Sequence, residues 1–371
     1  MKITTILVIG GYGFFGRRLV ERLSRQPALH IIIAGRSGIA AETLARKLQP
    51  GALCKLDAAT VDAMGPAFAN QLTQLNPAVV VNASGPFQAQ DYRVAEACIS
   101  ASAHYIDLAD SREFVVGIAA LNTAALRAGV LVTSGASSVP ALSSAAADRL
   151  VRGLQIVKTI DVGISPGNRT ERGLSTIQGI LSYCGKALPA STNMPATGWL
   201  RSYRHTYPSP VGSRLHSHCD VPDLGLFPSR YTGCPEVRFG AGLELEFLHR
   251  GMNLMAWMAH HGFVKNWAAH AKWLKRAADL FQNWGTDAGA MHVAVTGVTG
   301  EGQSVSRAWQ LVATDGDGPY VPTLAASALV RKIANGNYQY AGAMPCLGLL
   351  TLEDFCQEMS GLKITTSQTL Q

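Results

Sequence analysis

The chain has 371 residues, of which 47% are hydrophobic and 15% are charged, and its formal net charge is +7. This length suggests about two domains, and this composition excludes an intrinsically disordered chain because it supplies enough apolar surface for a core. The basic residues are scattered rather than clustered, so we expect an anionic small molecule as partner and no nucleic acid.

Three further features bear on location. No charge-free apolar stretch reaches the length of a membrane span, so we expect no transmembrane helix. The apolar start is interrupted by glycines and followed by Arg17 and Arg18, which argues against a signal peptide. Seven cysteines without a CxxC spacing indicate free thiols in a reducing compartment. We therefore expect a cytoplasmic protein.

The first 135 residues or so alternate between short apolar runs and helical stretches. This alternation predicts a doubly wound parallel sheet with crossover helices, and continuous apolar runs are typical of strands buried on both faces. Six strands are expected, as in a full Rossmann-type domain. The expected strands are residues 3–9, 30–34, 52–55, 78–82, 104–107 and 130–133.

The pattern changes after Gly135. We expect a helix opened by Ser137 and Ser138, a strand near 156–164, and a long irregular segment at 189–235 that is rich in Pro, Gly and Ser. Residues 291–298 and 307–314 flank a glycine-rich turn and predict a hairpin, and residues 351–359 predict a short helix. The fold class is therefore α/β: a Rossmann-type domain at 1–138 and an α+β domain at 139–340, which we expect to bind substrate or to dimerise and to contain a mainly antiparallel sheet.

A glycine-rich loop follows the first expected strand. Its residues match GxGxxG and open an apolar-periodic helix, which is the context in which this motif binds a dinucleotide. Gly11 allows the tight turn, Gly13 allows the pyrophosphate to approach the backbone, and Gly16 allows the helix to pack closely on the strand. The expected cofactor contacts here are Gly11, Tyr12, Gly13, Phe14, Phe15 and Gly16.

The residues after the second expected strand distinguish NADP from NAD. NAD sites place an acid there to hold the ribose 2′-hydroxyl, whereas this chain has Arg36 and Ser37. A guanidinium can bind the 2′-phosphate through two hydrogen bonds, so we expect NADP as the cofactor. Asp57, after the third expected strand, is a further candidate for a contact near the adenine, and a turn or capping role is an equal alternative.

Substrate and nicotinamide are expected beyond the carboxyl ends of the fourth to sixth strands. After the fourth strand we expect cofactor contacts from Ala83, Ser84, Gly85, Pro86 and Phe87. Asp107 and Asp110 follow the fifth strand and are the candidate acid–base residues, although Asp110 can equally cap a helix. Ser137 and Ser138 are candidates for binding a substrate carboxylate at a helix start.

Three features of the second domain are candidate partner sites. Arg169 and Arg172 follow its first strand and suit an anionic substrate group held between the domains. His216, His218 and Cys219 lack a second ligand cluster, so we expect no metal site. Residues 248–284 are rich in Trp and Met, which is consistent with helices that pack on a sheet, with a dimer surface or with peripheral membrane contact. We also expect a homodimer.

Several segments resemble the saccharopine dehydrogenase-like family of NADP-binding oxidoreductases, in particular its uncharacterised bacterial members. They are GGYGFFG, AGRS, VVVNASGPF, VAEACISASAHYIDLADS and SSVPALSS, which all lie within the first 150 residues. The resemblance implies a Rossmann domain, a second α/β domain that binds substrate, and a C-terminal segment, about 340–371, that returns to the first domain.

The leading hypothesis is an NADP-dependent oxidoreductase that transfers hydride between nicotinamide and an amino or imino carbon of an anionic substrate. One alternative is reduction of a C=C bond in a lipid-like substrate, an activity of some distant relatives, and the apolar stretch at 248–284 favours it. The other alternative is a non-catalytic NADP-binding protein, because no acid–base pair stands out in the sequence.

Overall fold

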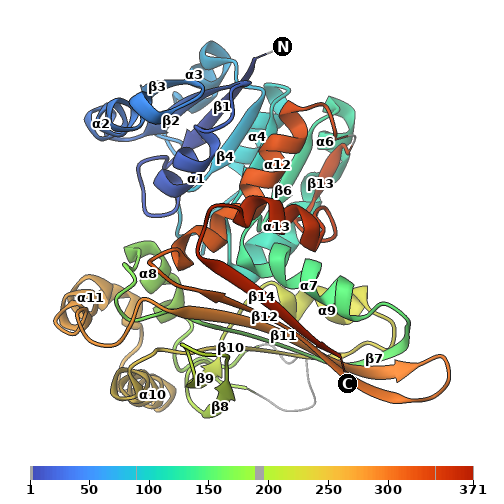
Figure 1. Cartoon of the computed structure of the whole chain (residues 1–371). Helices are drawn as coiled ribbons and strands as arrows, with labels where there is room; N and C mark the ends of the chain where they lie inside the picture. The colour runs from blue at the N-terminus through green and yellow to red at the C-terminus, as the bar shows by residue number, and fades with distance from the viewer. Residues whose placement is uncertain (1–2, 89, 189–195, 339, 371) are drawn as a thin grey trace. The chain divides into compact units, whose positions relative to one another are not determined.

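A computed structural model of the chain describes residues 3–88, 90–188, 196–338 and 340–370. Two compact units form within it, one from residues 1–142 and 320–358 and the other from residues 143–319 and 359–371. Each unit is built around one seven-stranded sheet (Figure 1). The two units are described separately below.

The sheet of the first unit is parallel throughout and runs in the order β13-β6-β5-β4-β1-β2-β3. Its central strands are buried on both faces, which explains why they appear in the sequence as continuous apolar runs. The strands are β1 (Thr4–Ile9), β2 (Leu29–Gly35), β3 (Lys55–Thr60), β4 (Val79–Asn82), β5 (His104–Asp107), β6 (Leu131–Ser134) and β13 (Gly342–Pro345).

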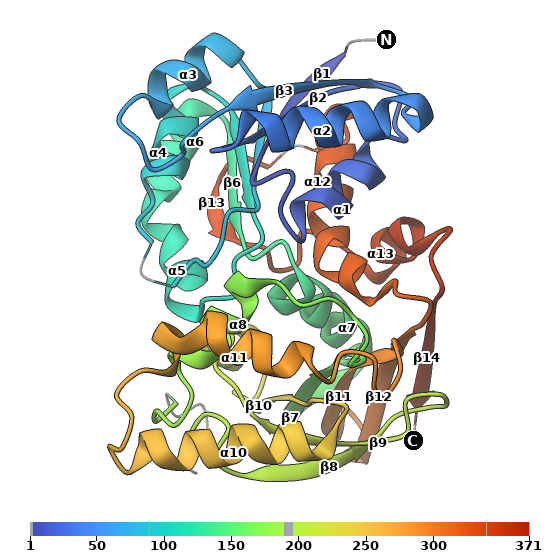
Figure 2. The ribbon, with the colours of Figure 1, turned by 90° about the vertical axis from the view of Figure 1, so that its left-hand side faces the viewer.

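Helices cover both faces of this sheet, as Figure 2 shows. One face is packed by side chains of α3, α4 and α6, while α1 and α12 lie on the other and contact each other. The helices of the unit are α1 (Gly16–Leu23), α2 (Gly38–Leu48), α3 (Phe68–Leu75), α4 (Arg93–Ser100), α5 (Arg112–Gly117), α6 (Asn122–Ala128), α12 (Leu324–Ala334) and α13 (Leu352–Met359). The predicted Rossmann-type architecture is confirmed.

One expected strand is misplaced. The prediction put the third strand at 52–55, but β3 begins at Lys55, where it pairs with His30. Residues 52–54 still belong to the turn that follows α2, because the side chain of Gln49 binds the carbonyl of Cys54 and the amide of Leu56. The strand therefore starts only after the turn that the two hydrogen bonds of the Gln49 side chain hold in place.

The sheet of the second unit runs in the order β14-β12-β11-β7-β10-β9-β8, and only the β7–β10 pair is parallel. The predicted hairpin is confirmed as β11 and β12, and the predicted mainly antiparallel character of the sheet is confirmed with it. The strands are β7 (Leu154–Ser165), β8 (Ser202–Thr206), β9 (Ser213–His218), β10 (Glu236–Ala241), β11 (Gly289–Thr299), β12 (Ser304–Ala313) and β14 (Ile364–Leu370).

The helices of the second unit are α7 (Ser143–Leu150), α8 (Leu174–Ser182), α9 (Asp223–Arg230), α10 (Glu246–His260) and α11 (Ala271–Asp279). Residues 189–235 are not the irregular segment that we expected, because they contain β8, β9 and α9. Residues 189–195 of that segment lie outside the described residues. The β8–β9 hairpin was missed because each strand carries a single large apolar side chain, Tyr203 or Leu215, so no apolar alternation marks it in the sequence.

The C-terminal part of the chain divides between the two units. β13 extends the parallel sheet, and α13 is held in the first unit by Glu358, which accepts a hydrogen bond from Ser327 and forms ion pairs with Arg22 and Arg331. These contacts confirm the expected contact of this helix with the N-terminal domain. The returning segment is shorter than the expected 340–371, however, because β14 pairs with β12 in the second sheet.

Candidate functional site

The glycine-rich loop lies at the carboxyl end of β1. Gly10 has a φ of +72°, and a Cβ there would lie 3.0 Å from the carbonyl carbon of Ala83. A Cβ on Gly16 would lie 2.1 Å from the carbonyl oxygen of Gly10, so only glycine lets α1 start this close to the strand. A Cβ on Gly11 or Gly13 would also meet a backbone oxygen. The loop therefore needs glycine at each motif position, as a pyrophosphate cradle does.

Tyr12 connects this loop to the end of β2. Its hydroxyl accepts a hydrogen bond of 2.9 Å from the amide of Ser37, and its ring lies against Gly35, where a Cβ would clash with it. Ser37 in turn caps α2, because its hydroxyl accepts a hydrogen bond from the amide of Ala40. These contacts fix the backbone on both sides of Arg36.

Arg36 is exposed directly after β2. Among the residues that the structure describes, no hydrogen bond or ion pair engages its guanidinium. A fixed backbone and an uncommitted guanidinium at the end of the second strand fit the binding of a ribose 2′-phosphate. Arg36 and Ser37 thus lie beside the glycine-rich loop, to which Tyr12 connects them.

Asp57 does not lie where we expected it. It is a residue of β3 itself, and its carboxylate binds Nε2 of His30 at 2.7 Å and Nζ of Lys55 at 2.6 Å. His30 and Lys55 are paired at the amino ends of their strands, opposite the edge that carries the glycine-rich loop. These contacts give Asp57 a structural role.

The loop that follows β4 lies against the glycine-rich loop at Gly10. Asn82 ends the strand, and its side-chain oxygen accepts hydrogen bonds from the amide and the hydroxyl of Ser84. Gln90 donates from its side chain to the carbonyls of Ser84 and Pro86. Ala83, Ser84, Gly85 and Pro86 are partly exposed and held from both ends, so they remain candidates for cofactor contact.

Phe87 has a different role from the rest of this loop. Its side chain is buried, and its ring centroid lies 5.3 Å from that of Phe114. It therefore anchors the loop in the interior of the first unit. Its backbone is still part of the candidate cofactor site, but its ring does not face a ligand.

Asp107 is fully buried at the end of β5. One carboxylate oxygen accepts three hydrogen bonds of 2.9 Å, from the amides of Ala109 and Gly135 and from the hydroxyl of Ser134. The other oxygen, Oδ2, has no partner among the described residues. Burial raises the pKa of Asp107 to about 6, and the three donors together with the hydroxyl of Tyr105 oppose that rise. Asp107 thus connects the ends of β5 and β6 through these hydrogen bonds.

We expect Asp107 to make stability depend on pH. An acid whose pKa is higher in the folded than in the unfolded chain stabilises the fold only while it is protonated, so its contribution is lost as pH rises from about 4 through 6. The free energy of unfolding, measured with urea, should fall over this range by about 3 kcal/mol more in the native chain than in Asp107→Asn. Asp62→Asn, an exposed acid of the same unit, serves as the control. Parallel pH curves for native chain and Asp107→Asn would contradict the assignment.

Asp110 lies next to the loop after β4. Its Oδ1 accepts a hydrogen bond of 3.2 Å from Nε2 of Gln88, which directly follows Phe87. Burial raises the pKa of Asp110, and the bond from Gln88 opposes that rise. Asp110 is partly exposed, whereas Asp107 is fully buried. Of the two carboxyls, Asp110 is the one that is hydrogen-bonded to a residue next to the loop after β4, which is the candidate nicotinamide loop. Sequence reasoning missed Gln88, for which the only signal was its position after the Gly-Pro-Phe turn.

Ser137 and Ser138 do not open a regular helix. Residues Ser138–Leu142 form a single wide turn in which Val139 is extended, and α7 begins only at Ser143. Pro140 explains the break, since the residue before a proline avoids the helical conformation. Both serines are buried, so the expected combination of hydroxyl and helix dipole is absent at these positions.

Arg169 and Arg172 follow β7 in the second unit, but they differ in availability. Arg172 is partly buried, and its guanidinium donates to the side-chain oxygen of Asn168 at 2.5 Å. Arg169 is exposed, and its Nε donates to the carbonyl of Asn283 at 3.2 Å. The terminal nitrogens of Arg169 make it the better candidate for an anionic ligand.

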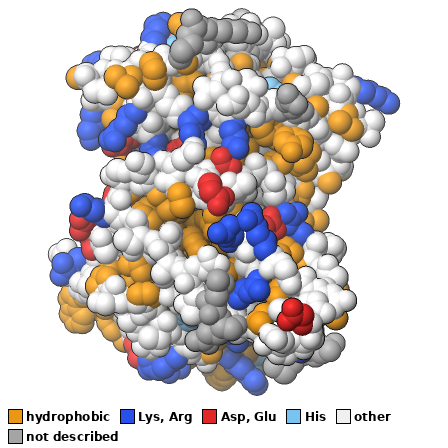
Figure 3. Space-filling model, turned by 45° about the vertical axis from the view of Figure 1, so that its right-hand side comes forward, with side chains coloured by type: hydrophobic (Ala, Val, Ile, Leu, Met, Phe, Trp, Pro, Cys, Tyr) orange, Lys and Arg blue, Asp and Glu red, His pale blue; other side chains and the backbone are white. Residues whose placement is uncertain are grey.

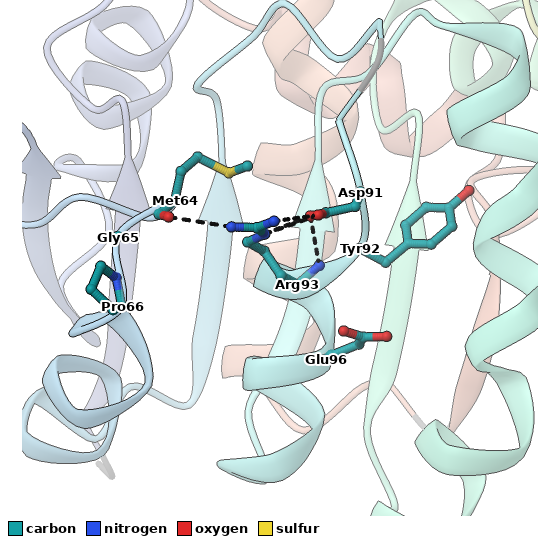
Figure 4. Close-up of a pocket in the computed structure, with 7 residues that line it drawn as sticks. All are labelled: Met64, Gly65, Pro66, Asp91, Tyr92, Arg93 and Glu96. Carbon is teal, nitrogen blue, oxygen red and sulfur yellow. Dashed lines mark hydrogen bonds and ion pairs between the residues drawn. The ribbon is translucent and has the colours of Figure 1, made fainter.

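A cavity of about 680 Å³ opens on the first unit beside the residues that follow β3 (Figure 4). Across it, Arg93 binds both carboxylate oxygens of Asp91 and reaches the carbonyl of Met64 at 3.4 Å. The guanidinium is thus already engaged within the protein. This arrangement fastens the loop after β3 to the start of α4 rather than presenting a free cation to a ligand.

Within the described ranges, no group of three or more His, Cys, Asp or Glu side chains is arranged to hold a metal ion. His216 instead pairs with the hydroxyl of Tyr207 at 2.9 Å.

All seven cysteines are free thiols. Among the described helices, none has both the length and the apolar character needed to cross a bilayer. Figure 3 shows one face of the molecule, on which Lys and Arg side chains lie in several separate groups.

Comparison with known proteins agrees with this geometry. Residues 6–146 match the family described as the saccharopine dehydrogenase NADP binding domain. The whole chain is similar to apo saccharopine dehydrogenase (L-Glu forming) from Saccharomyces cerevisiae, with a TM-score of 0.67 at 11% identity over 99% of this chain and 100% of that chain. A further similar structure is amine dehydrogenase from Mycobacterium smegmatis, with a TM-score of 0.48 at 12% identity over 93% of this chain and 94% of the other. A search of curated proteins finds no match.

The parallel sheet, its glycine-rich loop and the domain match together define an NADP-binding oxidoreductase. Residues 6–146 match the saccharopine dehydrogenase NADP binding domain, so it is the N-terminal part of the chain that carries this domain. The likeness to the yeast enzyme shows that both units share that enzyme's fold.

Proposed function

We propose that the protein transfers hydride between NADP(H) and the carbon of an amino or imino group on an anionic substrate. The carrying observation is the hydrogen bond from Gln88 to Asp110, which sets a carboxyl beside the loop of Ala83–Pro86. The nicotinamide supplies or accepts the hydride. In the reductive direction, hydride adds to the carbon of a protonated imine, and the C=N π electrons become the lone pair of the amine.

Asp110 is proposed to bind the nitrogen of the substrate. An ionised carboxylate stabilises the positive charge of a protonated imine and accepts N–H hydrogen bonds from it. In the oxidative direction, the same carboxylate takes a proton from the ammonium form, so that the nitrogen lone pair can expel the hydride. Gln88 donates to Oδ1 and leaves Oδ2 for the substrate.

The anionic group of the substrate is proposed to bind Arg169. Its guanidinium is exposed, and its Nε is held by the carbonyl of Asn283, which reduces the freedom lost when a carboxylate binds the terminal nitrogens. Arg172 supports the loop through Asn168 rather than contacting the substrate itself. Ser137 and Ser138, which are buried, are proposed to line the site mainly through their backbone.

A substrate panel tests this function. The protein is incubated with NADPH and one of two classes of substrate. The first class is imino acids, cyclic or open-chain, and the second is enoyl thioesters. The loss of reduced cofactor is followed by absorbance. Turnover of imino acids alone supports the proposal. Turnover of enoyl compounds alone would assign the chain to C=C reduction instead, and tight NADPH binding without any turnover would favour a non-catalytic role.

Arg169→Ala is expected to raise KM for an anionic substrate by about 10- to 100-fold, because it removes a charge-assisted contact that substrate and transition state share. Neither kcat nor the Kd of NADPH should change by more than about twofold. Arg152→Ala, an exposed arginine of the same unit, is the matched control. An unchanged KM in Arg169→Ala would remove this residue from the substrate site.

A further inference from the structure

The outer sides of α10 and α11 expose apolar side chains in unusual density. Of the fifteen large apolar residues that are exposed in the described part of the chain, seven lie between 247 and 284. Trp273 is 69% exposed and Leu280 is 80% exposed. We call these seven residues the α10–α11 surface: Phe247, Leu254, Trp257, Phe263, Trp273, Leu280 and Trp284.

These residues follow the helical repeat, so they form stripes rather than scattered points. Phe247, Leu254 and Trp257 lie seven and three residues apart along α10, which places them on one side of that helix. Trp273 and Leu280 are seven residues apart along α11 and its end, and Trp284 follows four residues later. A helix that merely covers a sheet turns such residues inward, whereas these face solvent.

The two stripes are continuous with each other. The ring of Phe247 at the start of α10 lies 5.9 Å from the ring of Trp284 and 5.0 Å from that of Phe281, after the end of α11. Near the other end of α10, Trp257 stacks on Phe263, which follows the helix, with ring centroids 5.6 Å apart. The start of α10 thus lies beside the segment that follows α11, and Figure 2 shows the two helices one above the other within the second unit.

Basic side chains border this apolar surface. Lys265, Lys272 and Arg276 are exposed, and no ion pair engages them among the described residues. The two acids nearby are already committed, since Glu246 pairs with Arg204 and Arg250, and Asp279 pairs with Lys275. Lys272 and Arg276 both lie to one side of Trp273 around α11 and are exposed, so positive charge lies next to this aromatic ring.

We propose that the α10–α11 surface binds the surface of an anionic lipid bilayer. Trp and Phe side chains favour the level of the lipid headgroups, and unpaired Lys and Arg are attracted by anionic headgroups. A second copy of the chain fits less well, because a symmetric contact would set the unpaired cations of one copy against the same cations of the other. The proposal concerns the second unit only and does not depend on the substrate.

Co-sedimentation with vesicles tests the proposal. The full chain should bind vesicles of phosphatidylcholine mixed with phosphatidylglycerol, bind phosphatidylcholine alone far more weakly, and lose binding in high salt. Replacing Lys272 and Arg276 by Gln should weaken binding by about 25-fold, since each basic residue near such a surface contributes about fivefold. Trp273→Ala combined with Leu280→Ala should weaken it by about tenfold or more.

Matched variants separate this surface from general charge and apolarity. Arg152→Gln with Lys158→Gln removes two exposed cations of the same unit, and Leu53→Ala with Leu126→Ala removes two exposed apolar side chains of the other. These variants should bind anionic vesicles as the native chain does, and all variants should retain its affinity for NADPH, which verifies folding. The proposal is overturned if the native chain ignores anionic vesicles, or if the surface variants bind them normally. It is also overturned if sedimentation velocity shows a dimer that Trp273→Ala dissociates, which would identify a second copy as the occupant.

Discussion

Arg36→Ala is expected to weaken the binding of NADPH by about 10- to 100-fold and to leave the binding of NADH nearly unchanged. The native chain should bind NADPH at least tenfold more tightly than NADH, which corresponds to about 1.4 kcal/mol. The two cofactors differ only in the 2′-phosphate, so an effect confined to NADPH reports the contact between that phosphate and the guanidinium.

The local geometry supports a large effect. Tyr12 and the Ser37 cap hold the backbone on either side of Arg36, so its side chain starts from a fixed point. No protein group has to release the guanidinium before it binds a phosphate, because none of the described residues engages it. Preorganisation of this kind lowers the conformational entropy that is lost on binding.

Fluorescence titration with both cofactors measures the effect. Arg36→Lys should retain part of the affinity for NADPH, because lysine keeps the charge but lacks the planar pair of donors. Tyr12→Phe should weaken NADPH binding less than Arg36→Ala does, since it loosens only the loop. Arg46→Ala, an exposed arginine on α2 that pairs with Glu42, is the control. Equal affinities of the native chain for NADPH and NADH would disprove the role of Arg36.

The strands of the first unit could be predicted well because each is a buried parallel strand with a continuous apolar run. β5 lies at the residues expected. No end of β1, β2, β4 or β6 differs from its expected position by more than one residue. β13 could not be assigned from local pattern, since four residues of Gly, Ala, Met and Pro carry no strand periodicity. Its place is set by pairing with β6, a contact between distant parts of the chain.

The candidate site could be predicted where backbone geometry decides the residue type. Gly11, Gly13 and Gly16 are needed because no side chain fits there, and such needs are visible in a sequence. Roles that depend on a partner side chain were less accessible. Asp57 follows the pattern of a ligand residue, yet His30 and Lys55 occupy its carboxylate, and nothing local indicates that pairing.

The two acids after β5 illustrate the same limit. Asp107 and Asp110 are three residues apart and were equal candidates for acid–base chemistry. The structure separates them, because Asp107 is fully buried and holds two amides and a hydroxyl, whereas Asp110 is bound by a single side chain next to the loop after β4. Which acid faces a ligand depends on the packing of α5 and on Gln88, neither of which a local pattern reveals.

Asp110→Asn is therefore expected to lower kcat by about 100-fold or more while the Kd of NADPH changes by less than about twofold. Asparagine keeps the size of the side chain and its hydrogen bond from Gln88, but it can neither hold a protonated nitrogen by charge nor accept a proton. The loss should thus appear in the chemical step with the substrate rather than in cofactor binding.

The pH dependence of kcat/KM provides a second, independent readout of this role. Burial raises the pKa of Asp110, so the carboxylate forms only at a higher pH than an exposed aspartate requires. If the ionised form is the active one, kcat/KM should rise as pH increases through that pKa and then level off, and this rising limb should be absent in Asp110→Asn. Gln88→Ala removes the donor that favours ionisation, and it should move the limb to higher pH without abolishing turnover. Asp110→Asn with native kcat and an unchanged pH profile would show that the carboxyl serves only the local structure, and the proton would then have to be exchanged through another group of the site.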